Sequence, residues 1–538
     1  MVMAGTPSTR TVCGIEIPAE QQTPLVEALL LIIEQLQDEI RRLKGLPEAP
    51  KRPPQPSPLN DDRGPPSASA QPKPTTPDGK RPGSAKRSKT QNLVIHQDVP
   101  LSLDGLPDGT KHLGSVDFTV QDLKVEAHNT RYRRGRYRLP DGTIQVAPLP
   151  KDVASHFGPT LQQYVLYQHF HNHVTQPLLH EELLELGVDI SAGQINHLLT
   201  EGHEAFHAEK DSLLPAAREV SAYLQTDDTS ARHRGKSGHT LHIGNDLFAA
   251  FFTTDTKSRV NFLKVLLTPH AGYLFNGDAL FYLECFDAPQ KLLTQLQADA
   301  GWLHEDDASW EAQLDAWKIE SAEQRRLVTE GALWANLLAH DLYTDLVLIS
   351  DDAGQFKLLA FLHALCWVHM ERHVARLIPL SDGQRAAYEA SRDAIWDYYQ
   401  RLKAYRQAPT PQWRGRLDND FDRLFLTKTG WPELNEVLRT IHGKKSELLV
   451  VLEHPEIPLH NNLSENDIRQ YVKKRKISAG TRSDAGRRCR DTFLSLKTTC
   501  RKLGVTFWQY LRDRIGRLNE VPSMADLIRR KAAEPATA

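Results

Sequence analysis

The sequence predicts an α/β fold, and three observations lead to this class. Residues 222–254 contain three short strand-like segments, and the turn signal Gly244-Asn-Asp246 separates the last two. Residues 345–350 form an apolar run typical of a strand buried on both faces. Helix-like stretches rich in Leu, Ala, Glu and Gln lie between these strands and after them. Strands and helices therefore alternate in the second half of the chain.

The bulk composition is that of a globular protein without a membrane segment. A length of 538 residues suggests two to four domains. The formal net charge of −2 excludes a globally basic protein, so any nucleic-acid surface must be local. Ala28–Ile33 is far too short to cross a bilayer, and no signal peptide is evident. The five cysteines are sparse and odd in number, which predicts a reducing, cytoplasmic compartment; they are Cys13, Cys285, Cys366, Cys489 and Cys500.

Residues 1–45 are expected to contain an N-terminal helix that begins at Thr23-Pro24 and ends at Gly45. Apolar residues recur along it at spacings of three and four, which favours a coiled coil for self-association. A single amphipathic helix docked on the body is the alternative. Residues 46–91 are rich in Pro, Ser, Lys and Arg, so they predict a disordered, basic linker.

Residues 92–150 predict a small β region. Phe118–Val125 is strand-like, and Asp141-Gly142 is a hairpin turn signal. Between them, arginines alternate with tyrosines, a composition that suits phosphate contact with base stacking. The expected DNA contacts in this run are Arg131, Arg133 and Arg134. A charged strand edge that resists aggregation is the alternative.

Residues 151–215 are predicted to be helical. One short helix spans Leu178–Leu186, Gly187 ends it, and Ser191 caps a second helix. Two helices joined in this way fit a helix-turn-helix that binds DNA. The second helix contains no lysine or arginine, so an ordinary helix pair is an equal alternative.

Residues 216–515 predict the main core. Three strands with antiparallel neighbours, followed by alternating strands and helices, follow the order of a ribonuclease-H-like fold. Helical insertions are expected near residues 275–340 and 371–450, with a fifth strand at Ala364–Val368 between them. Residues 516–538 are expected to form a C-terminal tail.

Carboxylates stand where the core strands are expected to end. Asp227-Asp228 follows the first strand and Asp351-Asp352 follows the buried one, while Glu465 opens a later helix after Asn462. Strand-end acids lie where α/β sheets bind ligands, and hard divalent ions such as Mg²⁺ choose carboxylate oxygens. Strand alternation puts only one acid of each pair in the site but does not choose between them. Turn residues, and a capping box formed by Asn462 and Glu465, are the simpler alternatives.

Four ordered motifs resemble those of one transposase family. They are Asp227-Asp-Thr229, Leu348-Ile-Ser-Asp351, Cys366-Trp-Val-His369-Met-Glu-Arg372 and Pro458-Leu-His-Asn-Asn-Leu-Ser-Glu465. In this order they resemble the DDE transposases of the insertion sequence sixty-six family over residues 155–515.

The resemblance implies a catalytic, metal-binding triad of Asp227, Asp351 and Glu465 that holds two Mg²⁺ or Mn²⁺ ions. It implies that Asp228 is a neighbour and not a ligand. The implied DNA partners are terminal inverted repeats and target DNA, cut and joined by a homo-oligomer in the bacterial nucleoid, with accessory proteins in some systems. A catalytically inactive DNA-binding regulator and a ribonuclease-H-like nuclease acting on another substrate are the alternative functions.

The sequence departs from the family pattern in three places. Residues 92–150 contain no cysteine, although the family usually has a zinc module before its helical segment. The interval between Asp227 and Asp351 is long, and the first motif has Asp228 in place of Glu. Cys366 and His369 match a Cys-x-x-His signature, which we interpret as a buried structural pair, since a zinc site wants four ligands.

Basic residues follow the last acid. On one helical face with Glu465 lie Arg469, Lys473 and Lys476, and the basic stretch 482–502 contains Arg487 and Arg488. These five side chains are expected to contact DNA phosphates. A solvated helix face is the alternative.

Overall fold

The computed structural model describes residues 94–534, except 103, 105–106, 108–109, 112, 114, 151–152, 154, 298–300, 343–345 and 358–361. It also describes two short N-terminal strands, β1 (Arg10–Val12) and β2 (Ile15–Ile17), which pair antiparallel. The predicted helix from Thr23 to Gly45 and the predicted linker over residues 46–91 lie outside the described residues.

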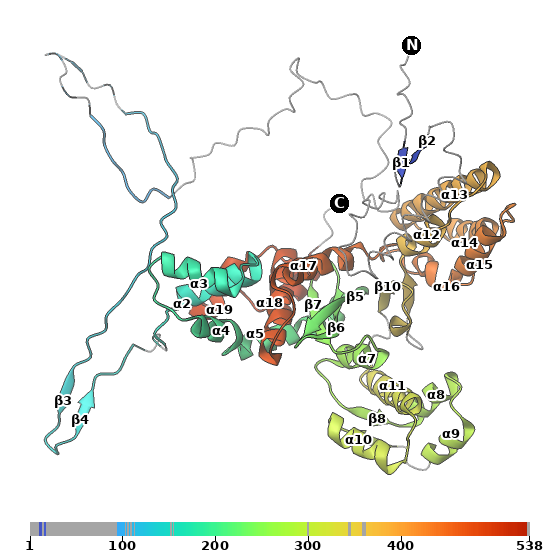
Figure 1. Ribbon diagram of the computed structural model, residues 1–538, viewed down its shortest axis with the longest axis horizontal. Helices are drawn as coiled ribbons and strands as arrows, with labels where there is room; N and C mark the ends of the chain where they lie inside the picture. Colours follow the sequence, from blue (N-terminus) through green and yellow to red (C-terminus); the bar gives the residue numbers. More distant parts are fainter. Residues whose placement is uncertain are drawn as a thin grey trace.

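A five-stranded mixed sheet of order β11-β10-β5-β6-β7 forms the centre of the molecule (Figure 1). β5 (Tyr223–His233), β6 (Lys236–Gly244) and β7 (Ala249–Thr254) form an antiparallel meander. β10 (Val347–Ser350) runs parallel to β5, and β11 (His363–Leu365) runs parallel to β10. The predicted α/β class, the meander and the buried fourth strand are confirmed.

Two boundaries in the sheet differ from the prediction. The fifth strand ends at Leu365 instead of Val368, because Trp367 already begins helix α12 (Trp367–Ala375). A short apolar run does not distinguish a strand from the first turn of a buried helix. β5 continues to His233, so Asp227 lies within the strand and not at its end. Asp227 nevertheless lies just past Gln225, the last β5 residue that pairs with β10.

Two helices near the C-terminus, α17 (Asn462–Ser478) and α18 (Asp484–Lys502), pack on the sheet. α18 lies along edge strand β7 and gives its backbone hydrogen-bond partners. The amide of Ala249 donates to Thr499 Oγ1 (3.1 Å), that of Phe251 to Ser495 Oγ (2.9 Å), and that of Thr253 to Asp491 Oδ2 (2.7 Å). Acceptors spaced by one helical turn thus satisfy alternate amides of the strand, which closes this edge to further pairing.

The helical segment before the sheet is built on the same core as the C-terminal helices. Its elements are α2 (Pro159–Leu166), the π-helix η3 (Tyr167–His171), α3 (Gln176–Glu185), α4 (Ala192–Thr200), α5 (Glu204–Asp211) and α6 (Leu213–Val220). The predicted pair of helices is present as α3 and α4, with Gly187 at φ +80° and Ser191 accepting from the Gln194 amide.

Two lysines connect this segment to the helices on the sheet. Lys474 of α17 is fully buried and donates to the carbonyl of His169 (2.6 Å). Lys497 of α18 donates to the carbonyl of His171 (3.1 Å). Both acceptors lie in η3, at an end where helix carbonyls lack partners within the helix.

The predicted C-terminal tail is wrong as a description of residues 516–534. α19 (Phe507–Gly516) is followed by α20 (Met524–Ala533), which packs against α6. Met524 and Ile528 of α20 are fully buried. These apolar residues, four apart on one helical face, give the last helix a reason to dock.

Two helical insertions are present near the predicted places, as Figure 1 shows. The first, after β7, contains α7 (Arg259–Leu267), β8 (Tyr273–Phe275), α8 (Gly277–Cys285), α9 (Gln290–Gln297), β9 (Trp302–His304), α10 (Asp307–Ala316) and α11 (Ala322–Ala339). The second, after α12, contains α13 (Asp382–Gln407), α14 (Pro411–Phe425), α15 (Pro432–His442) and α16 (Lys445–Leu448).

The region 92–150 contains less regular structure than predicted. A hairpin of β3 (Arg136–Arg138) and β4 (Ile144–Val146) turns through Asp141-Gly142, as predicted. Phe118–Val125 forms no strand, and Phe118 is 90% exposed. Strand-like composition alone does not make a strand, since its backbone groups need a neighbouring strand. None of the helices in the described residues is long and apolar enough to cross a membrane.

Candidate active site

The start of α17 is fixed to β5 by buried polar side chains. Asn461 Nδ2 donates to the carbonyl of Thr226 (2.7 Å). Gln225 donates through Nε2 to the carbonyl of His460 (3.1 Å) and accepts at Oε1 from the Ser464 amide (3.3 Å). Asn461 and Gln225 are fully buried, so these bonds are shielded from water. They place the first turn of α17, and with it Glu465, beside the middle of β5.

The predicted capping box is therefore wrong. α17 begins at Asn462, its N-cap is Asn461, and the cap makes no side-chain hydrogen bond to the helix. The side-chain amide of Asn461 instead donates to the carbonyl of Thr226 in β5. Tertiary contact has replaced the local cap, and Glu465 is left facing the sheet.

Asp227 lies in a cluster of carboxylates. Burial is the main reason that its pKa is raised to about 7, and the charges of Asp351, Asp228 and Glu465 raise it further. One hydrogen bond, from the Asp228 amide to Asp227 Oδ1 (2.7 Å), favours the ionised form. Asp351 and Glu465 thus lie near enough to Asp227 for their charges to affect its pKa.

In each pair of adjacent aspartates, one carboxylate forms ion pairs with lysine and the other, among the described residues, does not. Asp228 forms an ion pair with Lys257 (2.9 Å) and accepts from Gln355 (2.7 Å). Asp352 forms ion pairs with Lys357 (2.8 Å) and Lys444.

Asp227 and Asp351 have a different environment. Their carboxylates accept from backbone amides, those of Asp228 and Ala353 (3.1 Å), and form no ion pair within the described residues. The two acids without a cation are the two that the family motifs mark.

Glu465 has three cationic or titratable neighbours at a distance. Its Oε1 lies 3.7 Å from Arg372 Nη2 and 3.8 Å from His369 Nε2, and its Oε2 lies 3.7 Å from Arg469 Nη2. The side chain is only 16% exposed, yet Oε1 has no hydrogen-bond partner among the described residues. A buried carboxylate oxygen without a donor is costly, so it suits a cation.

The donor set fits hard divalent ions, although it is not closed around one. All three acids offer oxygens, which Mg²⁺ and Mn²⁺ prefer. Within the part of the chain that the structure describes, no three His, Cys, Asp or Glu side chains lie close enough together to hold a metal ion. Mutual repulsion, which helps raise the pKa of Asp227, opposes their closer approach.

Cys366 and His369, the predicted structural pair, have different surroundings. Cys366 is fully buried, and its Sγ accepts from the Asn461 amide (3.2 Å). Burial raises the pKa of its thiol to about 11, so it stays protonated. His369 instead lies one turn into α12, beside Glu465 and within 3.1 Å of Arg372 Nη1. Cys366 is the N-cap residue of α12 and His369 lies in the first turn of that helix. Their role as a structural pair stays a prediction.

Sequence reasoning missed Arg372 as a neighbour of Glu465. Its spacing of three from His369 on a predicted helix would have placed the two on one face. The quoted family motif contains both residues, but no pattern in the sequence indicated that this face meets the acids.

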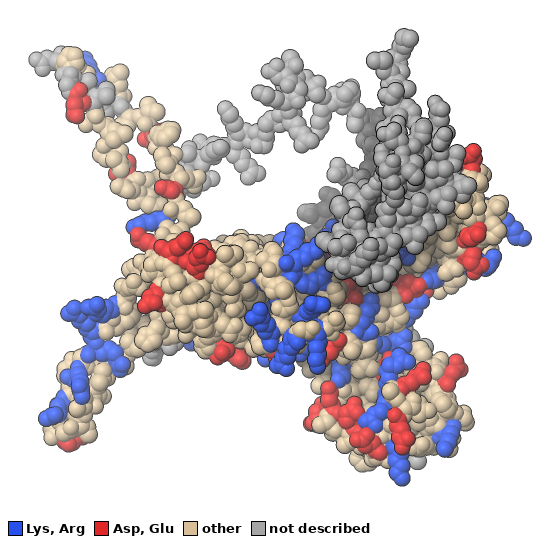
Figure 2. All heavy atoms as spheres, viewed as in Figure 1, with Lys and Arg blue, Asp and Glu red and all other residues tan. Residues whose placement is uncertain are grey.

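The predicted DNA contacts differ in exposure. Arg469, Lys473 and Lys476 of α17 are exposed, as is Arg488 of α18, whereas Arg487 is held by Asp255 (3.0 Å) and Asp484 (3.3 Å). Figure 2 shows Lys and Arg side chains gathered over the part of the view where Figure 1 labels α17 and α18. The other predicted contacts are exposed near the β3–β4 hairpin, which projects away from the sheet; they are Arg131, Arg133 and Arg134.

Comparisons with known proteins identify the family. The family described as "Transposase IS66 family" matches residues 330–488, a range that contains Asp351 and Glu465 but not Asp227. A protein of Sinorhizobium fredii (strain NBRC 101917 / NGR234), named "Uncharacterized protein y4jO", is 40% identical over 306 residues. The alignment spans 56% of this chain and 95% of that relative. With the four ordered motifs, these similarities establish that the chain belongs to the IS66 family of transposases.

Proposed function

We propose that this chain is an active DNA transposase, in which Asp227, Asp351 and Glu465 hold two Mg²⁺ or Mn²⁺ ions and carry out phosphodiester hydrolysis and strand transfer. The observation that carries the proposal is that Asp351, directly after β10, and Glu465 of α17 lie near enough to buried Asp227 of β5 for their charges to add to the rise in its pKa that burial causes. Family membership supports transposition as the overall process.

The strand order supports a ribonuclease-H-like core for this chemistry. Three antiparallel strands are followed by two parallel ones, and the first strand, β5, lies at the centre of the sheet. This arrangement puts Asp227 on the central strand and Asp351 directly after its parallel neighbour. The helix that contributes Glu465 then crosses near both.

The chain's own residues prepare the site for ions. Asn461 and Gln225 fix the distance of α17 from β5, and lysines neutralise Asp228 and Asp352 so that they do not compete for a cation. When bound, the two ions would activate the attacking hydroxyl and stabilise the leaving oxygen. Arg372 and Arg469 lie 3.7 Å from the Glu465 carboxylate, so substrate phosphates bound beside Glu465 would come near both guanidinium groups.

The proposed substrates are terminal inverted repeats and target DNA. Cations along α17 and at the start of α18 suit phosphate contact. The proposed set is Arg469, Lys473, Lys476, Arg487 and Arg488, all exposed except Arg487. Arg131, Arg133 and Arg134 and the α3–α4 pair are proposed as contacts further from the cut. Homo-oligomers are proposed because two DNA ends must be held together, with accessory proteins as additional partners.

The test is cleavage of element-end DNA by the full chain with Mg²⁺ or Mn²⁺. Asp351→Asn keeps the shape of the side chain and should abolish cleavage. Asp352→Asn is the matched control, one residue away and already paired with lysines, and should stay within a few-fold of the unmodified protein. Loss of cleavage in both variants, or in neither, would contradict the assignment of Asp351.

One outcome favours another function. If the unmodified chain binds end DNA but does not cut it with either ion, then the three acids do not work as a metal site. The chain would in that case act as a DNA-binding regulator derived from a transposase.

A further inference from the structure

A second basic surface lies at the far end of β5 and α17, and four of its six cations are outside the predicted contacts. It is formed by the β5–β6 turn and by the loop and first turn that connect α17 to α18. Six cations gather here, and they are Arg232, Arg234, Lys236, Arg482, Arg487 and Arg488. We call this set the hairpin-tip surface.

The surface is held together by backbone pairing between distant segments. The amide of Arg234 donates to the carbonyl of Thr481 (2.8 Å), and the amide of Thr481 donates to the carbonyl of Arg232 (2.9 Å). His233 and Thr481 thereby form a parallel β-bridge. A Cβ on Gly480 would lie only 2.5 Å from the Arg232 carbonyl oxygen, so the two backbones are in close contact. The turn is thus fixed to the loop.

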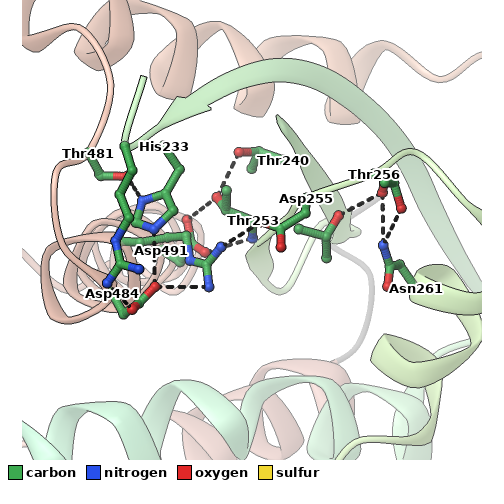
Figure 3. A network of polar contacts seen from close by, with 12 residues as sticks. His233, Thr240, Thr253, Asp255, Thr256, Asn261, Thr481, Asp484 and Asp491 are labelled. Atoms are coloured by element: carbon green, nitrogen blue, oxygen red, sulfur yellow. Dashed lines mark hydrogen bonds and ion pairs between the residues drawn. The ribbon is translucent and has the colours of Figure 1, made fainter. Parts of the chain in front are cut away.

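Side chains complete the same junction. Figure 3 shows His233, Thr481 and Asp484 pointing toward one another. His233 Nδ1 lies 2.9 Å from Thr481 Oγ1, and its Nε2 lies 3.1 Å from Asp484 Oδ1. Asp484 also pairs with Arg234 (2.5 Å) and Arg487 (3.3 Å). These contacts orient the tip without neutralising it.

Most of the charge on the hairpin-tip surface is available to a ligand. Asp484 and Asp255 are the carboxylates that pair with its cations among the described residues. The other four cations, Arg232, Lys236, Arg482 and Arg488, are exposed and form no ion pair within the described part of the chain. Beside them is a surface hollow of about 480 Å³, lined by Thr253, Asp484, Ala485, Arg487 and Arg488. The surface is therefore strongly cationic and open.

The distance from the acids fits a duplex. From Asp227 to Arg232, five residues of extended strand span ~17 Å. From Glu465 to Lys476, eleven residues of α17 span ~16 Å. Arg475 donates to Ser230 Oγ (2.7 Å), so helix and strand stay side by side between the two ends. Since B-form DNA advances 3.4 Å per base pair, ~17 Å is about five base pairs.

We infer that the hairpin-tip surface binds the phosphate backbone of duplex DNA about five base pairs from the phosphate that the acids attack. This inference rests on the proposed function and adds to it a contact region that none of the predicted DNA-binding residues except Arg487 and Arg488 included. Binding is through charge, because the surface offers the cationic side chains of a hairpin tip, a loop and the first turn of α18, and phosphate contacts of this kind carry no base sequence information.

The test measures the salt dependence of binding to a 40-base-pair duplex of mixed sequence, with the full chain. Neutralising one phosphate contributes about 0.9 to the slope of log affinity against log salt concentration. The triple variant Arg232→Ala, Lys236→Ala, Arg482→Ala should therefore lower the slope by about 2 to 3. A control triple, Lys291→Ala, Arg416→Ala, Lys428→Ala, removes the same charge from exposed sites on the helical insertions and should leave the slope unchanged.

Asp484→Asn should have the opposite effect and tighten binding, because it removes the carboxylate that pairs with Arg234 and one of the two that pair with Arg487. An unchanged slope in the first triple variant, with binding retained, would overturn the hairpin-tip surface and leave the proposed transposase function standing. Equal losses in both triples would also overturn it, as a general charge effect. Absence of duplex binding by the unmodified chain would overturn the proposed function as well.

Discussion

Replacing Asp227 with asparagine should stabilise the folded protein at neutral and alkaline pH. Burial and the neighbouring carboxylates raise the pKa of Asp227 from 3.8 to about 7. A difference of about three pKa units corresponds to about 4 kcal/mol, at about 1.4 kcal/mol per unit. Ionised Asp227 therefore destabilises the folded chain by about that amount at most, and asparagine removes the charge while keeping an acceptor for the Asp228 amide.

The direction of the pH dependence follows from the raised pKa. Between about pH 4 and pH 7 the folded chain retains a proton that the unfolded chain has lost. The free energy of unfolding contributed by this group therefore falls as the pH rises through that window, and the full penalty is present above pH 7. Below about pH 4 the Asp227→Asn variant and the unmodified protein should be equally stable. At pH 8 the variant should be more stable.

Urea unfolding followed by tryptophan fluorescence at pH 4, 6, 7 and 8 measures this difference. Adding Mg²⁺ at pH 8 should stabilise the unmodified protein more than the variant, because a bound cation offsets the repulsion. Asp228→Asn is the matched control and should not be stabilised, since it loses an ion pair with Lys257. Equal stability of the Asp227→Asn variant and the unmodified protein at pH 8 would refute the convergence of the acids around Asp227.

Three further substitutions test the supports of the site. Asn461→Ala removes the donor to Thr226 and should lower the free energy of unfolding by about 1–3 kcal/mol. The cleavage rate should fall by more than the folded fraction does, and urea unfolding measured beside cleavage rates checks this. Cys366→Ser should lower stability by about 1 kcal/mol yet preserve Mg²⁺-dependent cleavage, and zinc bound in proportion to this thiol in metal analysis would contradict a purely structural role. Gly480→Ala forces the new Cβ against the Arg232 carbonyl, so it should lower the free energy of unfolding by about 1–3 kcal/mol and weaken duplex binding. Urea unfolding and fluorescence anisotropy of a labelled duplex measure the two effects. If both are unchanged, the loop is not held against the turn.

Sequence alone predicted the strands whose partners are local. Gly244-Asn-Asp246 lies in the turn between β6 and β7, which pair antiparallel. A turn signal between two apolar runs predicts such a hairpin, because the two strands are neighbours in the sequence. Phe118–Val125 also has strand-like composition, but it pairs with no strand among the described residues, and Phe118 is 90% exposed. The end of β5 could not be predicted either, because residues 229–233 extend the strand by pairing with β6 through a turn without an apolar pattern.

The acids of the site were predicted mainly by motif order. Alternation could not choose Asp227 over Asp228, and the difference between them depends on Lys257, which lies 29 residues after Asp228 and pairs with it. The choice of Asp351 over Asp352 depends on Lys444 in the second insertion. Asn461 was not predicted to join α17 to β5, because the local capping rule assigned the start of the helix to Asn462 and Glu465. Long-range partners of this kind leave no periodic trace in the sequence.

Lys474 and Lys497, which donate to the end of η3, fix the distance between the helical segment and the acids. Lys474 belongs to the helix of Glu465, and it grips the carbonyl of His169 from a fully buried position. The predicted boundary at residue 215 falls inside α6 (Leu213–Val220), a helix whose buried residues belong to the same core as the sheet. DNA bound by α3 and α4 would therefore reach the acids at a fixed distance from the bound sequence. If the proposed function is correct, insertions between the recognition sequence and the cut should reduce cleavage.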